Sequence, residues 1–381
     1  MRVGETMGRI EALDVFRGLA VLCMIFVNAV PRPDLAPAFM LPAVPYGLSF
    51  ADLVFPAFLF AVGISGAVWL DKRAEMWFHD CVLEILKRAA VLFLLGIIYN
   101  VIPLLYQHLF PAEPQQLSFF SDLVRHLRFF GVLQRIALAY AGGMILYCFF
   151  RSNQILCLLA IALLAGSSAG AHIYAPDTPY DLATGIYQAV DGAVISAGHS
   201  YMSVLPDPEG LYGVISSIAT VLFGILSGQL LMVRNLETVL SQVTYGIGLF
   251  ILGFVWSFLD PVSRPLWTAP YTLLTAGVFF LVTACLHVLY CVAPSFSRAV
   301  FHFPMTFGRN AIFAYFAMGI LLPLYLNFPV KGVSLATYLW DTGLSQVLAP
   351  AFFSFCYALI WCVFWLPIFE YFYEHQIFFK V

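Results

Sequence analysis

The sequence predicts an all-α protein that crosses a membrane many times. Of its 381 residues, 62% are hydrophobic and only 10% are charged, whereas soluble domains hold roughly 45–50% apolar and about 25% charged residues. Mean hydropathy is +0.90. The apolar residues form runs of about 17–25 residues, the length that a helix needs to cross a hydrocarbon core of about 30 Å. We therefore predict one polytopic helical bundle, a single domain over residues 1–381.

About ten apolar runs follow one another along the chain, and each is expected to be a helix. A backbone that crosses lipid must satisfy its own hydrogen bonds, and a helix does so within one segment. The first run is expected to be a retained helix and not a cleaved signal peptide. The runs lie near 13–30, 51–70, 89–107, 130–150, 154–173, 211–232, 243–259, 269–292, 309–327 and 348–371.

The lysine and arginine residues predict which side of the membrane each loop faces. Cytoplasmic loops carry an excess of these residues. With the N-terminus in the cytoplasm, that side holds Arg2, Arg9, Arg17, Lys72, Arg73, Lys87, Arg88, Arg151, Arg234, Arg298 and Lys380. The opposite side then holds only Arg32, Arg125, Arg128, Arg264 and Lys331. This imbalance predicts that both termini are cytoplasmic.

The segments between the runs divide into one helix and three long loops. In residues 71–88, apolar side chains recur at helical spacing and charged side chains fill the other positions. This pattern is typical of an amphipathic helix on the cytoplasmic surface. The long external loops are 31–50, 108–129 and 174–210, which are rich in Pro, Gly, Asp and Tyr. Such loops carry binding sites, so an external substrate is expected to dock there.

The composition and motifs exclude several classes of function. The formal net charge of -3 comes from few ionisable groups, so the sequence argues against a nucleic-acid partner. Membrane lipid is the partner that the apolar runs predict. No stretch resembles a Ser-His-Asp arrangement, a nucleotide P-loop or a metal-ligand set, and we expect no metal.

Polar residues stand where three of the helices begin. Asp14 and Arg17 are three residues apart, so they share one face of the first helix at its cytoplasmic end. They are either a helix cap with an arginine that reaches water or a mouth that binds phosphate, because arginine forks suit phosphate and carboxylate groups. Arg135, Arg309 and Asn310 begin two later helices, where a guanidinium in the membrane must pair or meet water.

Further polar candidates lie on the external side. Asn28 ends the first helix, where it either caps that helix or faces a site, and Asp52 either caps the second helix or serves a site. His199 precedes Asp207 and Glu209 in the third long loop. This histidine is either a solvated loop residue or a base that touches substrate. The two acids either cap the following helix or bind the substrate.

Six stretches give the sequence its most specific signature. They are "LDVFRGLAVLCMIFVN" (13–28), "GLSFADLVFPAFLFAVGIS" (47–65), "GVLQRIALAY" (131–140), "DPEGLYGVISSIATVLFGILSGQLL" (207–231), "LWTAPYTLLTAG" (266–277) and "GRNAIFAYF" (308–316). In this order they resemble the heparan-α-glucosaminide N-acetyltransferase family of membrane acyltransferases and its bacterial relatives. Together they span most of the chain, although "LDVFRG" alone is also similar to the wider group of membrane acyltransferases.

The resemblance implies an enzyme that takes acetyl-CoA, or another acyl-CoA, from the cytoplasm. It would pass the acyl group to an amino sugar or other glycan on the external side. The thioester would reach the external half of the bundle near Asn28 and Asp52, which form the expected catalytic set with His199. Asp207 and Glu209 are the expected substrate-binding residues. The expected donor-binding residues are Asp14, Arg17, Arg135, Arg309 and Asn310, with Arg135 at the far end of the donor.

The chain departs from the family at one important position. The family pattern has a catalytic histidine shortly before the aspartate of "DLVFP", but no histidine lies between Asn28 and Asp52. Such a histidine takes a proton from the attacking amine or hydroxyl. Three hypotheses stay open: another base such as His199, Asp34 or Asp207 replaces it, an acceptor that is already deprotonated needs only positioning, or transfer activity has been lost.

The sequence leaves alternatives for the protein's role and surroundings. A sugar transporter or permease, or a catalytically inactive binding homologue, is the alternative to an acyltransferase. Short loops favour a bacterial cytoplasmic (inner) membrane over a lysosomal one. The family picture is also compatible with a homodimer.

Overall fold

A computed structural model describes residues 10–30, 32–73, 75–111, 118–233, 235–343 and 349–379. Arg2, Arg9, Arg234 and Lys380 of the predicted charge balance lie outside the described residues, as does part of the predicted loop 108–129. The regular secondary structure of the described chain is helical apart from one short hairpin, which confirms the all-α class.

Within the described residues, ten helices of 17 to 32 residues build the bundle. They are α1 (Glu11–Asn28), α2 (Val54–Asp71), α3 (Phe78–Leu109), α5 (Val132–Phe149), α6 (Asn153–Tyr174), α8 (Tyr212–Met232), α9 (Leu236–Trp256), α10 (Ala269–Val292), α13 (Ala311–Asn327) and α15 (Pro350–Glu374). The shorter elements are helices α4 (Phe119–His126), α7 (Ile186–Val194), α11 (Pro294–Val300), α12 (His302–Arg309) and α14 (Leu335–Thr342), and the antiparallel hairpin β1 (Pro329–Val330) and β2 (Val333–Ser334). Single 3-10 turns lie at Pro33–Leu35, Ala38–Met40, Ala51–Leu53, Ala197–His199 and Tyr201–Ser203.

The lengths of these helices suit a membrane. Within the described residues, eight helices are long and apolar enough to cross one, and α12 with α13 form a ninth candidate, bent by 81°. The first predicted run corresponds to α1. This helix is not one of the eight, because its 18 residues include three charged ones, Glu11, Asp14 and Arg17. These observations support an integral membrane protein.

The predicted separate helix over 71–88 is wrong. Asp71 ends α2, and Phe78 begins α3, which continues to Leu109 as one helix of 32 residues. The charged residues from Asp80 to Arg88 occupy the first turns of α3, because no helix-breaking residue separates them from the apolar run that follows. Lys72, Arg73 and Glu75 lie in the turn between α2 and α3. The helical spacing was therefore real, but it belonged to the beginning of α3.

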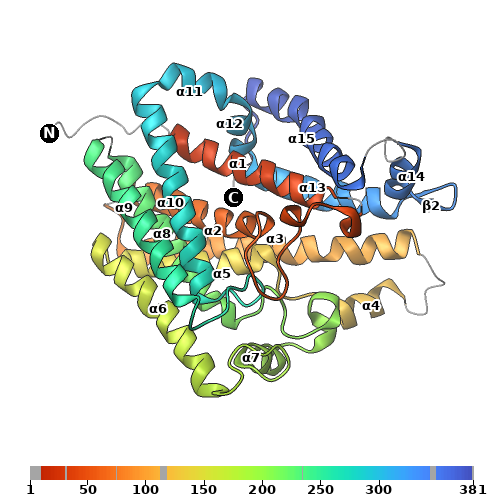
Figure 1. Ribbon diagram of the computed structural model, residues 1–381, viewed down its shortest axis with the longest axis horizontal. Helices are drawn as coiled ribbons and strands as arrows, with labels where there is room; N and C mark the ends of the chain where they lie inside the picture. Colours follow the sequence, from red (N-terminus) through yellow and green to blue (C-terminus); the bar gives the residue numbers. More distant parts are fainter. Residues whose placement is uncertain are drawn as a thin grey trace.

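The bundle has two packed groups of helices. Figure 1 shows α12, α13 and α15 beside α1 at one side, and α6, α8, α9 and α10 at the other. Buried apolar side chains fill both groups, with the larger core around α2, α5, α8 and α10 and the smaller one between α1, α13 and α15. The helices α1 and α2 lie where the two groups meet.

Two glycines bring α12 directly against α1. A Cβ atom at Gly18 would lie 1.6 Å from the carbonyl oxygen of Pro304, and one at Gly308 would lie 1.7 Å from that of Asp14. Such an approach is possible only without side chains, as in the small-residue contacts of membrane helices. The contact places Arg309, the last residue of α12, beside the first turn of α1.

The two ends of the bundle differ in charge. We call one the basic end, which carries Arg17, Lys72, Arg73, Arg88 and Arg309. The acidic end carries the buried carboxylates Asp52, Asp191, Asp207, Glu209 and Asp260. Helix α1 begins at the basic end, where α2 ends, so the sequence prediction assigns the basic end to the cytoplasm.

Candidate active site

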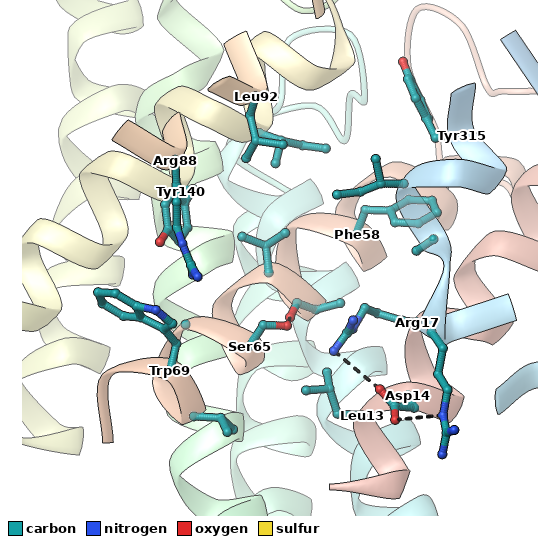
Figure 2. A pocket seen from close by; sticks show the side chains of 18 of the residues that line it. Leu13, Asp14, Arg17, Phe58, Ser65, Trp69, Arg88, Leu92, Tyr140 and Tyr315 are labelled. Carbon is teal, nitrogen blue, oxygen red and sulfur yellow. Dashed lines mark hydrogen bonds and ion pairs between the residues drawn. The ribbon is translucent and has the colours of Figure 1, made fainter. Parts of the chain in front are cut away.

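A cavity of about 670 Å³ opens among α1, α2, α3, α5 and α13. Phe58 and Trp69 both line it and stand eleven residues apart on α2, which corresponds to a depth of about 16 Å at 1.5 Å per residue. Figure 2 shows Asp14 and Trp69 toward one end and Leu92 and Tyr315 toward the other. The cavity therefore extends from the basic end deep into the bundle.

The mouth of the cavity holds three of the predicted donor-binding residues. The carboxylate of Asp14 is buried and lies 3.6 Å from Arg17 and 3.9 Å from Arg309. Arg17 also donates a long hydrogen bond of 3.5 Å to the carbonyl of Gly308. One buried acid thus orients two arginines toward the cavity, and these arginines carry one net positive charge beyond Asp14.

A second cationic group at the mouth was not singled out by the sequence analysis. The guanidinium groups of Arg73 and Arg88 lie 4.7 and 5.0 Å from the ring centre of Trp69, and Arg88 extends beside Tyr140 (Figure 2). From the sequence, both arginines are predicted only to face the cytoplasm. A usable signal was the spacing of Trp69 and Arg73, because residues four apart share a helix face.

Asn310 holds the chain's C-terminal segment over the cavity. Its Nδ2 donates to the carbonyl of Ile377 at 3.0 Å, and its Oδ1 accepts from the backbone N–H of Phe379 at 3.0 Å. Phe378 and Phe379 line the cavity, and the Arg309 guanidinium lies 4.4 Å from the ring of Tyr373. The structure therefore places Asn310 next to the predicted donor site as a residue that positions its wall.

The deep part of the cavity is apolar and ends near a tyrosine pair. Its lining includes Phe58, Leu92 and Leu133. Tyr315 also lines it, with its ring centre 4.6 Å from that of Tyr99. In Figure 2 the hydroxyl of Tyr315 points away from the basic end. A narrow apolar arm fits this part of the cavity better than a charged group, because burial of an unpaired charge is costly.

A network of ionic groups lies beyond the tyrosine pair, at the acidic end. We call it the acidic network, and its members are Arg128, Arg135, Asp191, Asp207 and Glu209. Arg128 donates to both oxygens of Asp207, with a distance of 2.9 Å from Nε to Oδ2, and it also forms an ion pair with Glu209. Burial alone would lower the pKa of Arg128, but its hydrogen bonds and ion pairs with these two acids outweigh burial and raise that pKa. Arg128 therefore stays charged and fixes both acids.

Asp191 organises the loop that carries these acids. Its carboxylate accepts from the backbone N–H of Asp207 at 3.0 Å and from that of Leu211 at 2.8 Å. Burial raises the pKa of Asp191, and the two hydrogen bonds oppose that rise. The predicted pair Asp207 and Glu209 is thus held as one rigid unit with Asp191, and Asp207 does not simply cap the following helix.

Arg135 lies between the helices and does not line the cavity. It is 1% exposed, donates from Nη2 to the carbonyl of Gly210 at 2.9 Å, and lies 5.1 Å from the ring of Trp267. Its Nε and Nη1 have no hydrogen-bond partner among the described residues. The structure places this predicted donor-binding residue beside the acidic loop, on the side of α5 that faces α8 and α10.

Asp52 anchors the loop that precedes α2. Its side chain is fully buried, and Oδ2 accepts from the N–H of Ala43 at 3.0 Å and from the N–H and hydroxyl of Ser49 at 2.8 and 2.9 Å. Oδ1 lies 3.1 Å from Nε of Arg264, an ion pair without an aligned hydrogen bond. The carboxylate therefore ties two loops to the helix, beyond the simple cap that the sequence suggested.

The other two predicted catalytic residues lie in different surroundings. Asn28 is exposed at the end of α1, and the backbone N–H of Ala29 closes that helix. His199 is half-buried, pairs through Nδ1 with the carbonyl of Leu127 at 2.8 Å, and stacks on Phe129. Because Leu127 and Phe129 flank Arg128, the structure brings His199 close to the acidic network but leaves Asn28 apart from it.

Asp34, a predicted replacement base, forms an ion pair with Arg32. It is exposed and accepts from Nε and Nη2 of Arg32 at 3.0 and 2.9 Å. The hydrogen bond from Arg32 lowers the pKa of this carboxylate. A lower pKa makes a carboxylate a weaker base.

Taken together, these features suit a ligand with three chemically distinct parts. The basic mouth suits an anionic head, because arginines form charge-assisted bonds with phosphate groups. The deep part suits an apolar arm. The acidic network beyond Tyr315 suits a cationic or hydroxyl-rich partner that arrives from the other end.

Comparison with known proteins gives one family. A family model described as "Heparan-alpha-glucosaminide N-acetyltransferase, catalytic" matches residues 9–235. The human heparan-alpha-glucosaminide N-acetyltransferase is 24% identical over 369 residues, which cover 81% of this chain and 52% of the human protein. The mouse protein of the same name is 23% identical over 377 residues, which cover 82% of this chain and 54% of the mouse protein. The chain thus spans about half the length of these curated relatives.

Proposed function

Because the chain belongs to the heparan-α-glucosaminide N-acetyltransferase family, we propose that it is a transmembrane acyltransferase. It takes an acetyl or other acyl group from acyl-CoA at the basic end and passes it to an amino sugar or other glycan at the acidic end. The observation that carries this proposal is the cavity, which joins a mouth of five cationic side chains to an apolar interior near the acidic network.

The mouth offers the charge that a CoA head requires. Arg17 and Arg309 share the buried carboxylate of Asp14, Arg73 and Arg88 share the ring of Trp69, and Lys72 also lines the mouth. Guanidinium forks bind phosphate oxygens in pairs. We assign the phosphates of the donor to these residues.

The apolar part of the cavity would receive the pantetheine arm. Its depth of about 16 Å brings a thioester from the mouth toward Leu133 and Tyr315. A thioester is reactive enough to drive amide formation without an ion gradient. The protein then accelerates transfer by holding donor and acceptor in contact and by stabilising the developing oxyanion.

The proposal includes the protein's surroundings. The excess of basic residues at the donor end favours that end in the cytoplasm, where acyl-CoA is made. The loops between the spanning helices are short compared with a folded domain, the longest predicted one being residues 174–210, and this favours a bacterial cytoplasmic membrane. A homodimer remains part of the proposal, because the apolar outer faces of the helices suit either lipid or a second subunit.

Equilibrium binding of acetyl-CoA to the purified protein in detergent tests the donor site. We expect Arg17→Ala to raise the Kd about tenfold or more, because a hydrogen bond to a charged group contributes roughly 1.5–3 kcal/mol. Arg151→Ala is the matched control, since Arg151 is an exposed arginine outside the cavity lining, and its Kd should equal that of the wild type. Absence of saturable binding by folded wild-type protein would overturn the proposal and favour transport or scaffolding.

A further inference from the structure

We propose that Glu209 is the base that removes a proton from the attacking amine of the acceptor. This inference rests on the proposed function. It assigns the role for which the chain has no histidine between Asn28 and Asp52.

Among the three acids of the acidic network, Glu209 has a carboxylate oxygen that accepts no hydrogen bond from the described residues. Both oxygens of Asp207 accept hydrogen bonds from Arg128, and both oxygens of Asp191 accept from backbone N–H groups. In Glu209, Arg128 contacts Oε2, and no hydrogen bond among the described residues uses Oε1. The side chain is 8% exposed. One oxygen is therefore held in place while the other can accept a proton.

The position of Glu209 connects the donor cavity with the acidic end. Gly210, the residue after Glu209, accepts a hydrogen bond from Arg135 at 2.9 Å, and Arg135 lies in α5 between Leu133 and Ile136, which line the cavity. A carboxylate at this place lies between the expected thioester and the loops through which an acceptor would arrive.

The charge around Glu209 favours an amine in its ammonium form. Three carboxylates, Asp191, Asp207 and Glu209, face the two guanidinium groups of Arg128 and Arg135, so the network carries one net negative charge. A cationic acceptor beside Glu209 would balance this charge.

The proposed reaction moves the acyl group from the thioester sulfur to the acceptor nitrogen. The Glu209 carboxylate takes one proton from the acceptor's ammonium group and leaves a neutral amine. The amine lone pair forms the C–N bond at the thioester carbonyl, and the carbonyl electron pair moves to oxygen. Collapse of this intermediate breaks the C–S bond, the thiolate takes the second proton from nitrogen, and Glu209 releases its proton to water. The products are the amide and free CoA.

Two acceptors distinguish a base from a structural residue. Glucosamine is largely protonated at pH 7 and must lose a proton, whereas hydroxylamine is already a neutral nucleophile at that pH. With acetyl-CoA as donor, we expect Glu209→Gln to lower kcat for glucosamine about 100-fold or more, the range of general base catalysis. Transfer to hydroxylamine and the Kd for acetyl-CoA should stay within roughly twofold of the wild type.

Control variants complete the design. Glu237→Gln makes the same change at an exposed glutamate of α9 and should transfer to both acceptors at the wild-type rate. Glu209→Asp keeps the charge but withdraws it by one methylene, so it should retain partial activity with glucosamine even if the glutamine variant folds poorly.

Three outcomes would overturn the inference. One is wild-type transfer to glucosamine by Glu209→Gln, and another is an equal loss with both acceptors in folded protein. The third is a selective loss with glucosamine in His199→Gln but not in Glu209→Gln, which would assign the base to the histidine. In each case the proposed function itself would stand. Failure of the wild type to acylate either acceptor would instead remove the proposed function, and this inference with it.

Discussion

Asp52→Ala is expected to destabilise the folded protein by about 3–5 kcal/mol, because it leaves the partly buried charge of Arg264 without its partner. The carboxylate is fully buried and holds Ala43 and Ser49 as well. Its loss would release the loop before α2. Thermal unfolding of the detergent-solubilised protein would show a much lower midpoint, measured by the reaction of a thiol-reactive dye with Cys81, which is buried in the folded protein.

Two further variants separate the interpretations of Asp52. Asp34→Ala removes an exposed acid from an ion pair in a nearby loop and should leave the midpoint unchanged. Asp52→Ala combined with Arg264→Leu removes both charges and should recover part of the lost stability. If Asp52→Ala unfolds like the wild type yet fails to transfer the acyl group, Asp52 belongs to the catalytic set that the resemblance implies.

Arg73→Gln with Arg88→Gln is expected to weaken acetyl-CoA binding about 100-fold or more. Each guanidinium would lose a charge-assisted contact of roughly 1.5–3 kcal/mol with a phosphate, and the two losses together correspond to at least two decades in Kd. The effect should shrink at high ionic strength, because salt screens partly exposed charges.

Acetyl-pantetheine provides the control ligand, because it has the arm and the thioester but lacks the nucleotide. The double variant should bind acetyl-pantetheine as the wild type does. Lys87→Gln is the control variant, since Lys87 is exposed next to Arg88 and outside the cavity lining. Equal weakening of both ligands by the double variant would show that these arginines support the fold and do not bind the nucleotide.

The helices could be predicted from the sequence because lipid imposes a simple rule. A run of apolar residues long enough to cross the membrane must be a helix, and Ala269–Val292 has the predicted bounds. The rule says little about where one helix begins. Residues 71–88 show this limit, because the same helical spacing fits a separate surface helix and the first turns of α3.

The site could be predicted only where its residues lie close together in the sequence. Asp14 and Arg17 share one turn of α1, so their joint position followed from helical spacing. The contribution of Arg309 depends on the close approach of Gly18 and Gly308, which joins segments about 290 residues apart. The pairing of Arg128 with Asp207 and Glu209 likewise joins two loops, and spacing along a single chain does not encode such contacts.

In the proposed function, an acyl group passes from a donor at one end of the bundle to an acceptor at the other. The most direct test uses sealed proteoliposomes with a glucosamine-terminated oligosaccharide trapped inside and labelled acetyl-CoA added outside. We predict labelled oligosaccharide in the lumen, formed only when the protein is present and reduced by Arg73→Gln with Arg88→Gln. The proposed transfer across the bundle would be wrong if labelled product formed only when donor and acceptor share one compartment. It would also be wrong if unmodified oligosaccharide passed out of the vesicles.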